Sequence, residues 1–286
     1  MEIKDLAGLS EPATKIIEAL RNGIGVLYEP TRIRRLARAE TEAAELVARS
    51  NLRIQVREAR RQRNLESIIG KAVPLLPAST SQEEFDEDWL AEFANDAQDV
   101  SNETMQSLWA RILAGQAVKQ GSFSRRTLQA VRVLSQGDAK SFTHFCSYVW
   151  SMNGTYCHYA PVAVDSEVLA KEGLTFGNML HLQSIGLVTE IGGFGGRRGF
   201  GDTGVHLSLE TGPQRAEYHG RRFEGEVLSE APKPALSVVP LTPVGEELVP
   251  IAGAKPSPAY LDYCLDRLST SMANWRETTN APQGSP

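Results

Sequence analysis

The sequence contains no long apolar run, and its 286 residues include only three cysteines, Cys146, Cys157 and Cys264. Its longest apolar stretches, such as residues 23–28, are far shorter than the roughly 18 residues that a membrane-spanning helix requires, so we expect no membrane span. Three widely separated cysteines are typical of buried thiols in a reducing compartment rather than of a disulfide framework. Because no basic and apolar leader opens the chain, a cytoplasmic location is expected.

Motifs that carry a known reaction mechanism are also missing. The chain has no G-x-S-x-G, no H-E-x-x-H, no paired C-x-x-C and no G-K-[ST] sequence. The glycine-rich stretch at residues 192–204 has expected strands on both sides, which is typical of a hairpin tip rather than of a phosphate-binding loop. We therefore predict no catalytic residue and no cofactor, and we favour a non-enzymatic protein.

Two groups of side chains could be drawn as metal ligands. His144, Cys146, Cys157 and His158 do not have the spacing of common zinc sites, and Cys146 falls on the apolar face of its helix. The carboxylates at residues 86–92 precede and open a helix, where negative charge is favourable against the helix dipole. Buried thiols, satisfied histidines and helix capping explain both groups, so we predict no metal site.

Charge is distributed unevenly along a chain whose formal net charge is −5. Residues 32–66 contain ten arginines and five glutamates, whereas residues 72–110 contain nine acidic residues and no Lys or Arg. Adjacent segments of opposite sign indicate either contact between them or separate partners.

Residues 31–71 are expected to form one long helix, because they contain no proline and no glycine before Gly70. Apolar residues recur there at spacings of three and four, with several polar interruptions, which indicates a thin seam. A helix of about forty residues extends for about 60 Å, and a single domain rarely covers that length. We therefore predict that the helix binds a second copy or a partner protein through these seam residues: Ile33, Ala37, Ala44, Val47, Ile54, Leu65 and Ile68.

A line of arginines follows one side of the same helix: Arg49, Arg53, Arg57 and Arg60 or Arg61. Such a line can follow the phosphates of a nucleic acid. It can also remain solvated, or pair with the acidic segment at residues 83–103 of the same or a neighbouring chain. We favour the solvated or salt-bridged face, and nucleic-acid binding stays open as the alternative.

The predicted fold is mainly α, with three domains and a tail. Residues 1–78 form the N-terminal helices, residues 79–155 a central helical bundle, and residues 156–270 a winged-helix-like α+β domain with an enlarged β-wing. The tail at residues 271–286 is expected to be disordered. In the bundle, Gly115 is expected to end one helix, Ser135 and Asp138 match a capping box, and the predicted core is Trp89, Phe93, Leu108, Trp109, Ile112 and Leu113.

The second helix of the winged-helix-like domain, near residues 176–185, is the position from which such a domain can read DNA. Its polar side chains are Asn178, His181 and Gln183, and it carries no Arg or Lys. Because specific DNA sites need several cationic phosphate contacts, an interaction or dimerisation module is favoured. Four arginines of the wing keep DNA binding open: Arg197, Arg198, Arg221 and Arg222.

Separated segments of the chain resemble a bacterial family of unknown function. They are NGIGVLYEPTRIRRLARAE (22–40), SLWARILAG (107–115), GSFSRRTLQAV (121–131) and LTPVGEEL (241–248). That family is similar in its central helices to the abortive-infection protein alpha family. The resemblance implies a bacterial protein of antiphage defence with no assigned catalytic residues. Together with the long helix, which carries the assembly prediction, it leads us to expect a non-enzymatic oligomerising sensor, scaffold or effector. A nucleic-acid-binding regulator is the alternative, and a toxin or nuclease with an unfamiliar site is a third.

Overall fold

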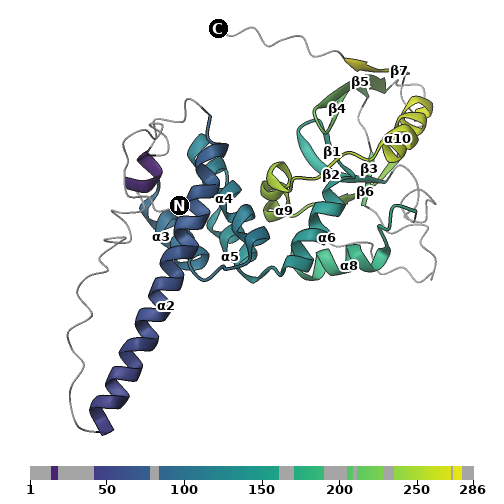
Figure 1. The fold of residues 1–286 in the computed structure, drawn as a ribbon. Coiled ribbons are helices and arrows are strands. Elements are labelled where there is room, and N and C mark those ends of the chain that lie inside the picture. Colours follow the sequence, from purple (N-terminus) through teal and green to yellow (C-terminus); the bar gives the residue numbers. More distant parts are fainter. Residues whose placement is uncertain are drawn as a thin grey trace. The chain divides into compact units, whose positions relative to one another are not determined.

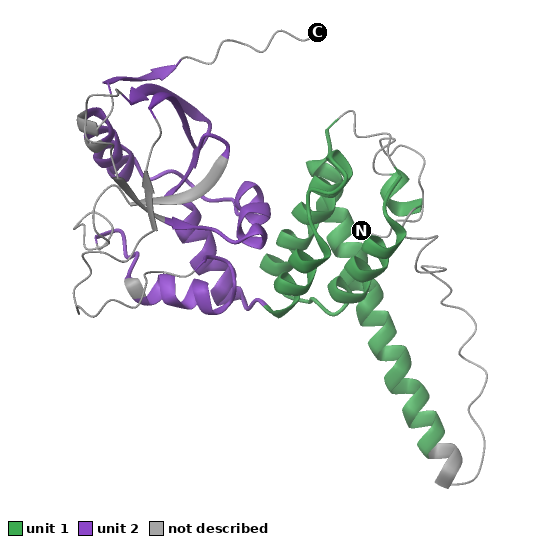
Figure 2. Ribbon diagram, turned by 180° about the vertical axis from the view of Figure 1, so that it is seen from behind, with its two compact units in different colours: residues 1–133 green, residues 134–286 purple. Residues whose placement is uncertain are grey.

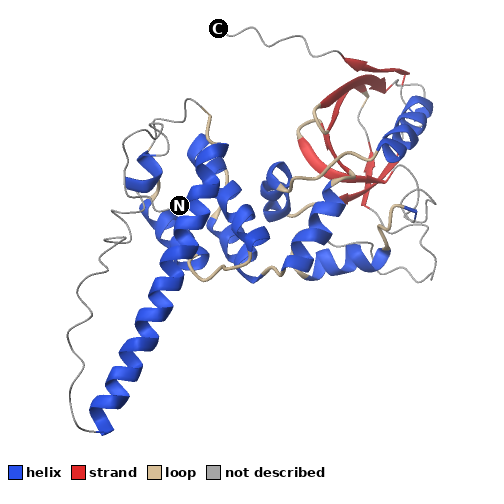
Figure 3. Cartoon of the chain, viewed as in Figure 1, coloured by secondary structure: helices blue, strands red, loops and turns tan. Residues whose placement is uncertain are grey.

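The computed structural model describes residues 14–18, 42–77, 84–160, 171–189, 205–208, 211–227, 235–271 and 273–278. They belong to two compact units, Met1–Val133 and Leu134–Pro286 (Figure 2). Helices predominate, and the second unit also contains one antiparallel sheet (Figure 3). The two units differ from the expected division after residues 78 and 155, because the helix that precedes residue 78 packs on the helices that follow it.

Unit 1 is a bundle of helices (Figure 1). Its elements are a short helix at residues 14–18, α2 (Glu42–Ala72), the 3-10 turn η2 (Val73–Leu75), α3 (Glu87–Ala97), α4 (Glu103–Val118) and α5 (Arg125–Val133). Helix α2 packs along α4, and α3 packs against α5. Helix α4 is the centre of the bundle, since it buries residues along its whole length. The expected helical residues 31–41 lie outside the described part.

An aromatic cluster forms the core of unit 1. Trp89 stacks on Phe93 with ring centroids 5.3 Å apart, and Phe93 meets Trp109 edge-on at 5.4 Å. The indole N–H of Trp89 donates to the carbonyl oxygen of Phe123 at 2.7 Å, which satisfies the polar end of a buried ring. The predicted core is confirmed, because each of its six residues is buried: Trp89, Phe93, Leu108, Trp109, Ile112 and Leu113.

Gly115 does not end α4, which continues to Val118. A Cβ atom at Gly115 would lie 2.6 Å from the ring of Phe123. The glycine therefore allows the ring of Phe123 to pack directly on the helix backbone, and the prediction of a helix end at this position is wrong.

Unit 2 combines helices with a seven-stranded antiparallel sheet. Its helices are α6 (Gln136–Cys146), α8 (Phe176–Ser184), α9 (Pro243–Leu248), the 3-10 turn η4 (Val249–Ile251) and α10 (Pro258–Ser271). Its strands are β1 (Val149–Met152), β2 (Thr155–Ala160), β3 (Val205–Ser208), β4 (Gly212–Tyr218), β5 (Arg221–Val227), β6 (Ala235–Pro240) and β7 (Ala273–Thr278). The strand order is β3-β6-β2-β1-β4-β5-β7.

The core of unit 2 is built around Tyr218 at the end of β4. Its ring stacks on Trp150 with centroids 4.8 Å apart. Its hydroxyl donates to the carbonyl of Ser147 at 2.5 Å and accepts from the N–H of Ser257 at 2.9 Å. These two bonds join the end of α6 to the start of α10, and burial raises the pKa of Tyr218 to about 12.

Three predictions for the C-terminal half differ from the structure. The strands expected as a wing belong to one seven-stranded sheet, whose centre is the β1–β2 hairpin, so the winged-helix-like arrangement is not confirmed. Helix α6, which is expected in the central bundle, packs in unit 2. Residues 273–278 of the expected disordered tail form β7, which pairs with β5.

Helix starts in unit 2 follow the sequence closely. The capping box of Ser135 and Asp138 is present, with the Ser135 hydroxyl accepting from the N–H of Asp138 at 3.1 Å. The hydroxyls of Thr175 and Thr242 likewise accept from the N–H three residues later, at the starts of α8 and α9. The predicted capping box of Ser135 and Asp138 is confirmed; it is a local signal, since its bonds span only three residues.

Replacing Trp109 by alanine is expected to lower the free energy of unfolding of unit 1 by about 3–5 kcal/mol, since its ring is fully buried and its loss leaves a cavity. Urea denaturation followed by circular dichroism measures this change. The control is Val133→Ala, at a residue that is 78% exposed, for which a change within about 0.5 kcal/mol is expected. Equal denaturation midpoints for the two variants would show that Trp109 is not a core residue.

Candidate functional site

Buried polar side chains fix the C-terminal half of α2 on α4. The Asn64 amide donates to the carbonyl of Gln98 at 2.8 Å, and its Oδ1 accepts from Nε2 of Gln106 at 3.4 Å. The Oε1 atom of Gln106 accepts from Nζ of Lys71 and from the hydroxyl of Ser67, both at 2.8 Å. An unpaired amide in this buried setting would cost about 1–3 kcal/mol, so the network determines how α2 is rotated on α4.

This rotation buries the last two residues of the predicted seam. Leu65 is 5% exposed and Ile68 is fully buried, and both lie in the core of their own unit. The prediction that they bind another molecule is therefore wrong. Ile33 and Ala37 lie outside the described residues, and Ala44 lies on α2.

The N-terminal half of α2 extends beyond the other helices of unit 1 (Figure 1). We name residues 46–60 of α2 the arm, and none of them is buried. The arm carries five of the nine large apolar side chains that are exposed in the described part of the chain: Leu46, Val47, Leu52, Ile54 and Val56. Concentrated apolar exposure of this kind marks protein-binding surfaces.

The apolar side chains of the arm point in two opposite directions. At 3.6 residues per turn, Val47 and Ile54 continue the face of α2 that enters the core. Leu52 and Val56 lie on the opposite face, and Ala59 follows them at the next turn. We name Leu52, Val56 and Ala59 the outer face; all three are exposed.

The arginine line is partly neutralised by the acidic segment of the same chain. Arg60 donates to Asp99 at 2.8 Å, and Arg61 donates to both carboxylate oxygens of Asp99 at 3.0 and 2.8 Å. The hydrogen bond from Arg61 lowers the pKa of Asp99. Arg57 and Arg61 also bond Glu58 at 3.1 and 3.2 Å. The expected salt-bridged face is thus confirmed at Arg60 and Arg61, whereas Arg49 and Arg53 are exposed on the arm.

The arginines proposed for the wing are also salt-bridged. Arg221 donates to both oxygens of Glu277 at 2.8 and 2.7 Å, and Arg222 donates to Glu217 at 3.4 Å. Residues 197–198 lie outside the described part. Neither described arginine is therefore a free cation for binding phosphate.

Helix α8 uses two of its three candidate base-reading side chains for internal bonds. The Oδ1 atom of Asn178 accepts from the backbone N–H of Thr175 at 3.0 Å and completes the capping box. Nε2 of His181 lies 2.6 Å from a carboxylate oxygen of Asp138. The backbone N–H of Ser135 is the main cause of the lowered pKa of Asp138. These bonds further weaken the interpretation of α8 as a DNA-reading helix.

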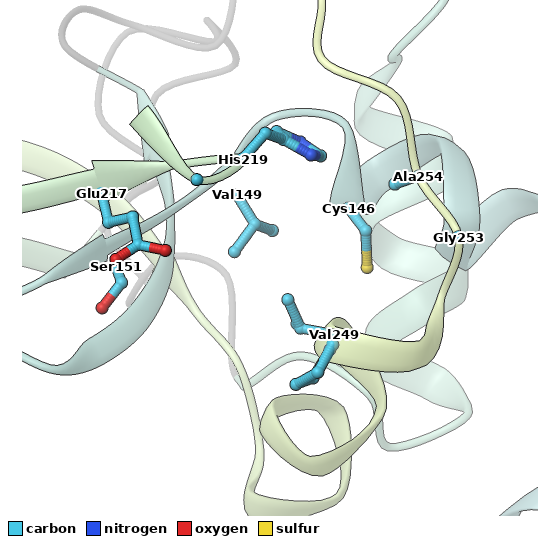
Figure 4. A pocket seen from close by; sticks show the side chains of 10 residues that line it. Cys146, Val149, Ser151, Glu217, His219, Val249, Gly253 and Ala254 are labelled. Atoms are coloured by element: carbon cyan, nitrogen blue, oxygen red, sulfur yellow. The ribbon is translucent and has the colours of Figure 1, made fainter. Parts of the chain in front are cut away.

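A pocket of about 210 Å³ lies in unit 2 between the β4–β5 turn and η4 (Figure 4). Its polar side chains are Ser151, Glu217 and His219, and burial lowers the pKa of His219. Burial also raises the pKa of the Cys146 thiol in its wall, so this sulfur stays protonated and is a poor nucleophile. Glu217 already pairs with Arg222. The pocket therefore offers a small polar cavity without an activated nucleophile.

Metal ligands do not gather elsewhere in the described ranges. Across these residues, no group of three or more His, Cys, Asp or Glu side chains could hold an ion. Cys264 is buried, which raises its pKa to about 12. No helix among the described elements is both long enough and apolar enough to cross a membrane.

These features define a class of protein with a helical unit, a projecting helix and a second unit in which helices accompany an antiparallel sheet. The chain belongs to the DUF2806 family, whose model, described as a protein of unknown function, matches residues 48–265. No curated protein and no solved structure matches the chain. The resemblance to a family of unknown function is thereby confirmed, whereas the link to the abortive-infection protein alpha family stays a prediction.

Replacing Asp99 by asparagine is expected to lower the free energy of unfolding of unit 1 by about 0.5–1 kcal/mol at pH 7, the usual size for partly exposed ion pairs. Because the folded-state pKa of Asp99 is lowered, its contribution is present above the ordinary pKa near 4 and is lost as the pH falls through the lowered value. The difference between the two chains should thus shrink as the pH falls from 7 to below the ordinary pKa near 4. Urea titrations over this pH range measure it.

The matched control is Glu84→Gln, at an exposed carboxylate just before α3, and no change in stability is expected for it. A difference between the Asp99→Asn chain and the unchanged chain that is the same at every pH would contradict the ion pair with Arg60 and Arg61.

Proposed function

We propose that the chain is a non-enzymatic protein that assembles with a second copy of itself through the arm of α2. The observation that supports this function is the 59% and 61% exposure of Leu52 and Val56 on the outer face. Covering apolar surface contributes about 25 cal/mol per Å². A helix that leaves these two side chains in solvent on one face therefore gains stability when another helix packs on that face.

The outer face suits pairing with an identical helix. A second helix can lie along Leu52, Val56 and Ala59 without meeting α3 or α4, because the buried face of α2 is on the other side. In an antiparallel pair whose two-fold axis passes midway between Leu52 and Val56, Leu52 of each copy would contact Val56 of the other. It would also separate the two copies of Arg49 along the helix axis, whereas parallel pairing in register would place them opposite each other. Separation of like charges favours the antiparallel orientation.

Nucleic-acid binding through the same helix is the alternative. Arg49 and Arg53 favour it, because both are exposed on the arm. Against it, Asp99 already binds Arg60 and Arg61, and a phosphate backbone would leave the apolar side chains of the arm uncovered.

We further propose that assembly serves bacterial antiphage defence, with the protein acting as a sensor, scaffold or effector. This setting rests on the resemblance of residues 22–40, 107–115, 121–131 and 241–248 to a family similar to the abortive-infection protein alpha family. An assembling, non-enzymatic protein is compatible with each of the three roles.

Replacing Leu52 and Val56 together by aspartate is expected to weaken self-association at least about 100-fold, because pairing would then bury unpaired carboxylates. The full-length protein is measured by light scattering and sedimentation over a concentration series. The matched control is Val47→Asp, at a residue that is 59% exposed on the opposite face of the same helix, just as Leu52 is 59% exposed. We expect the control to associate like the unchanged chain.

The proposed assembly is contradicted if the unchanged chain stays a single copy at about 100 µM, a concentration at which even weak self-association is detectable. Equal weakening by both variants would contradict the assignment of the outer face. Salt-sensitive binding of DNA or RNA that Arg49→Glu and Arg53→Glu abolish, without self-association, would establish the alternative function.

At least one of a panel of phages is expected to form fewer plaques on bacteria that express the unchanged chain than on bacteria with an empty vector. The Leu52→Asp and Val56→Asp double variant should lose this protection, because defence requires assembly in this proposal. The Val47→Asp variant should keep it. Protection that is equal for both variants would separate defence from assembly through the outer face.

A further inference from the structure

Strand β7 is held at the edge of the sheet by few buried contacts. It pairs with β5 alone, in antiparallel register from Arg222 opposite Thr278 to Glu226 opposite Ala273. None of its six residues is fully buried: three are half-buried and three are exposed. Elements with little buried surface open locally at low free energy. Strand β7, at the edge of the sheet with so little buried surface, is therefore able to leave it at low cost.

The edge of β5 nevertheless contains a well-formed seat for one side chain of β7. The ring of Trp275 stacks on Phe223 with centroids 5.9 Å apart and an angle of 11° between the ring planes. A Cβ atom at Gly225 would lie 2.5 Å from this ring. The absence of a side chain at Gly225 thus opens the space that the indole fills. The register shifts between Glu224 and Glu226, which places the glycine at an irregularity of the strand.

A charged group lies beside this seat. Arg221 binds the carboxylate of Glu277 through two hydrogen bonds at 2.8 and 2.7 Å. The same guanidinium lies over the ring of Phe223, at 5.6 Å from its centroid. The edge of β5 therefore fits an extended segment that carries a large aromatic side chain and, two residues later, a carboxylate.

Two features show that β7 fills this seat imperfectly. The indole N–H of Trp275 is buried without a hydrogen-bond partner among the described residues, which is unfavourable for a polar group. Asn274 next to it has a φ of 55°, a left-handed conformation that interrupts the extended backbone of the strand. Strand β7 also lies outside residues 48–265, which the family model matches, whereas the whole of β5 lies within them.

We propose that the outer edge of β5 is a strand-accepting site for an extended segment of a partner protein, with an aromatic residue followed two positions later by Asp or Glu. In the free protein β7 occupies this site, and the partner segment displaces it. Addition of a strand to a sheet edge supplies backbone hydrogen bonds for affinity, while the seat of Gly225 and Phe223 and the guanidinium of Arg221 supply specificity. This site is in unit 2 and is independent of the arm.

The probe is a fluorescently labelled peptide with the sequence of residues 272–279, MANWRETT, titrated by anisotropy against the full-length protein. Replacing Trp275 by alanine weakens the hold of β7, so this variant is expected to bind the peptide at least tenfold more tightly than the unchanged chain. The matched control is Arg276→Ala, at the exposed neighbour in the same strand, which should bind like the unchanged chain. A peptide with alanine in place of its tryptophan should bind at least tenfold more weakly to the Trp275→Ala chain.

Hydrogen exchange of the unchanged chain tests whether β7 opens from the sheet, and it needs no variant. Amides of β7 are expected to exchange at least tenfold faster than those of β4, which is interior to the sheet. Equal protection of β7 and β4 would overturn the proposal, because β7 would then be an integral strand. A folded Trp275→Ala chain that binds the peptide no better than the Arg276→Ala chain would overturn it as well.

Discussion

The buried bonds between Asn64, Gln106 and Lys71 are the constraint on which the arm depends. An amide in a core is costly unless each of its polar atoms has a partner, and here the partners are available at only one rotation of α2 on α4. That rotation directs Leu65 and Ile68 into the bundle. Because α2 is continuous from Glu42 to Ala72, the rotation also fixes the directions in which the side chains of the arm project. The exposed arm is thus a consequence of how the buried half is bonded.

In unit 2 the hydroxyl of Tyr218 has a corresponding role. It joins Ser147 after α6 to Ser257 before α10, so two helices and the end of β4 share one bonded group. The turn of the β4–β5 hairpin, which follows Tyr218, is therefore anchored, whereas the other edge of β5 pairs only with β7. Unit 2 combines a rigid centre with a weakly held edge, and this difference within one sheet is what allows one strand to open without the others.

The sequence predicted features that depend on neighbouring residues and missed those that depend on distant ones. The capping box at Ser135 and the aromatic core around Trp109 were correct, because caps span three residues and helical spacing identifies a buried face. The seam was wrong at Leu65, since a heptad pattern does not distinguish a helix of the same chain from a helix of another. Strand β7 was missed because residues 273–278 are mostly polar and their pairing partner β5 lies about 50 residues earlier in the chain. For the arginine line the sequence left three alternatives open: a solvated face, salt bridges to the acidic segment, or phosphate binding. The salt bridges to Asp99 could be identified only from the fold.

Electrostatics and apolar burial act in opposite directions on the arm. Leu52 and Val56 favour contact with an identical outer face, whereas Arg49 and Arg53 give each arm a positive charge that opposes contact. Asp99 reduces this repulsion by neutralising Arg60 and Arg61 at the inner end of the arm. The arm therefore combines an apolar driving force with a positive charge that opposes it, and the balance between them depends on orientation. A parallel pair in register would place the two copies of Arg49 opposite each other, whereas an antiparallel pair separates them along the helix axis and still covers Leu52 and Val56.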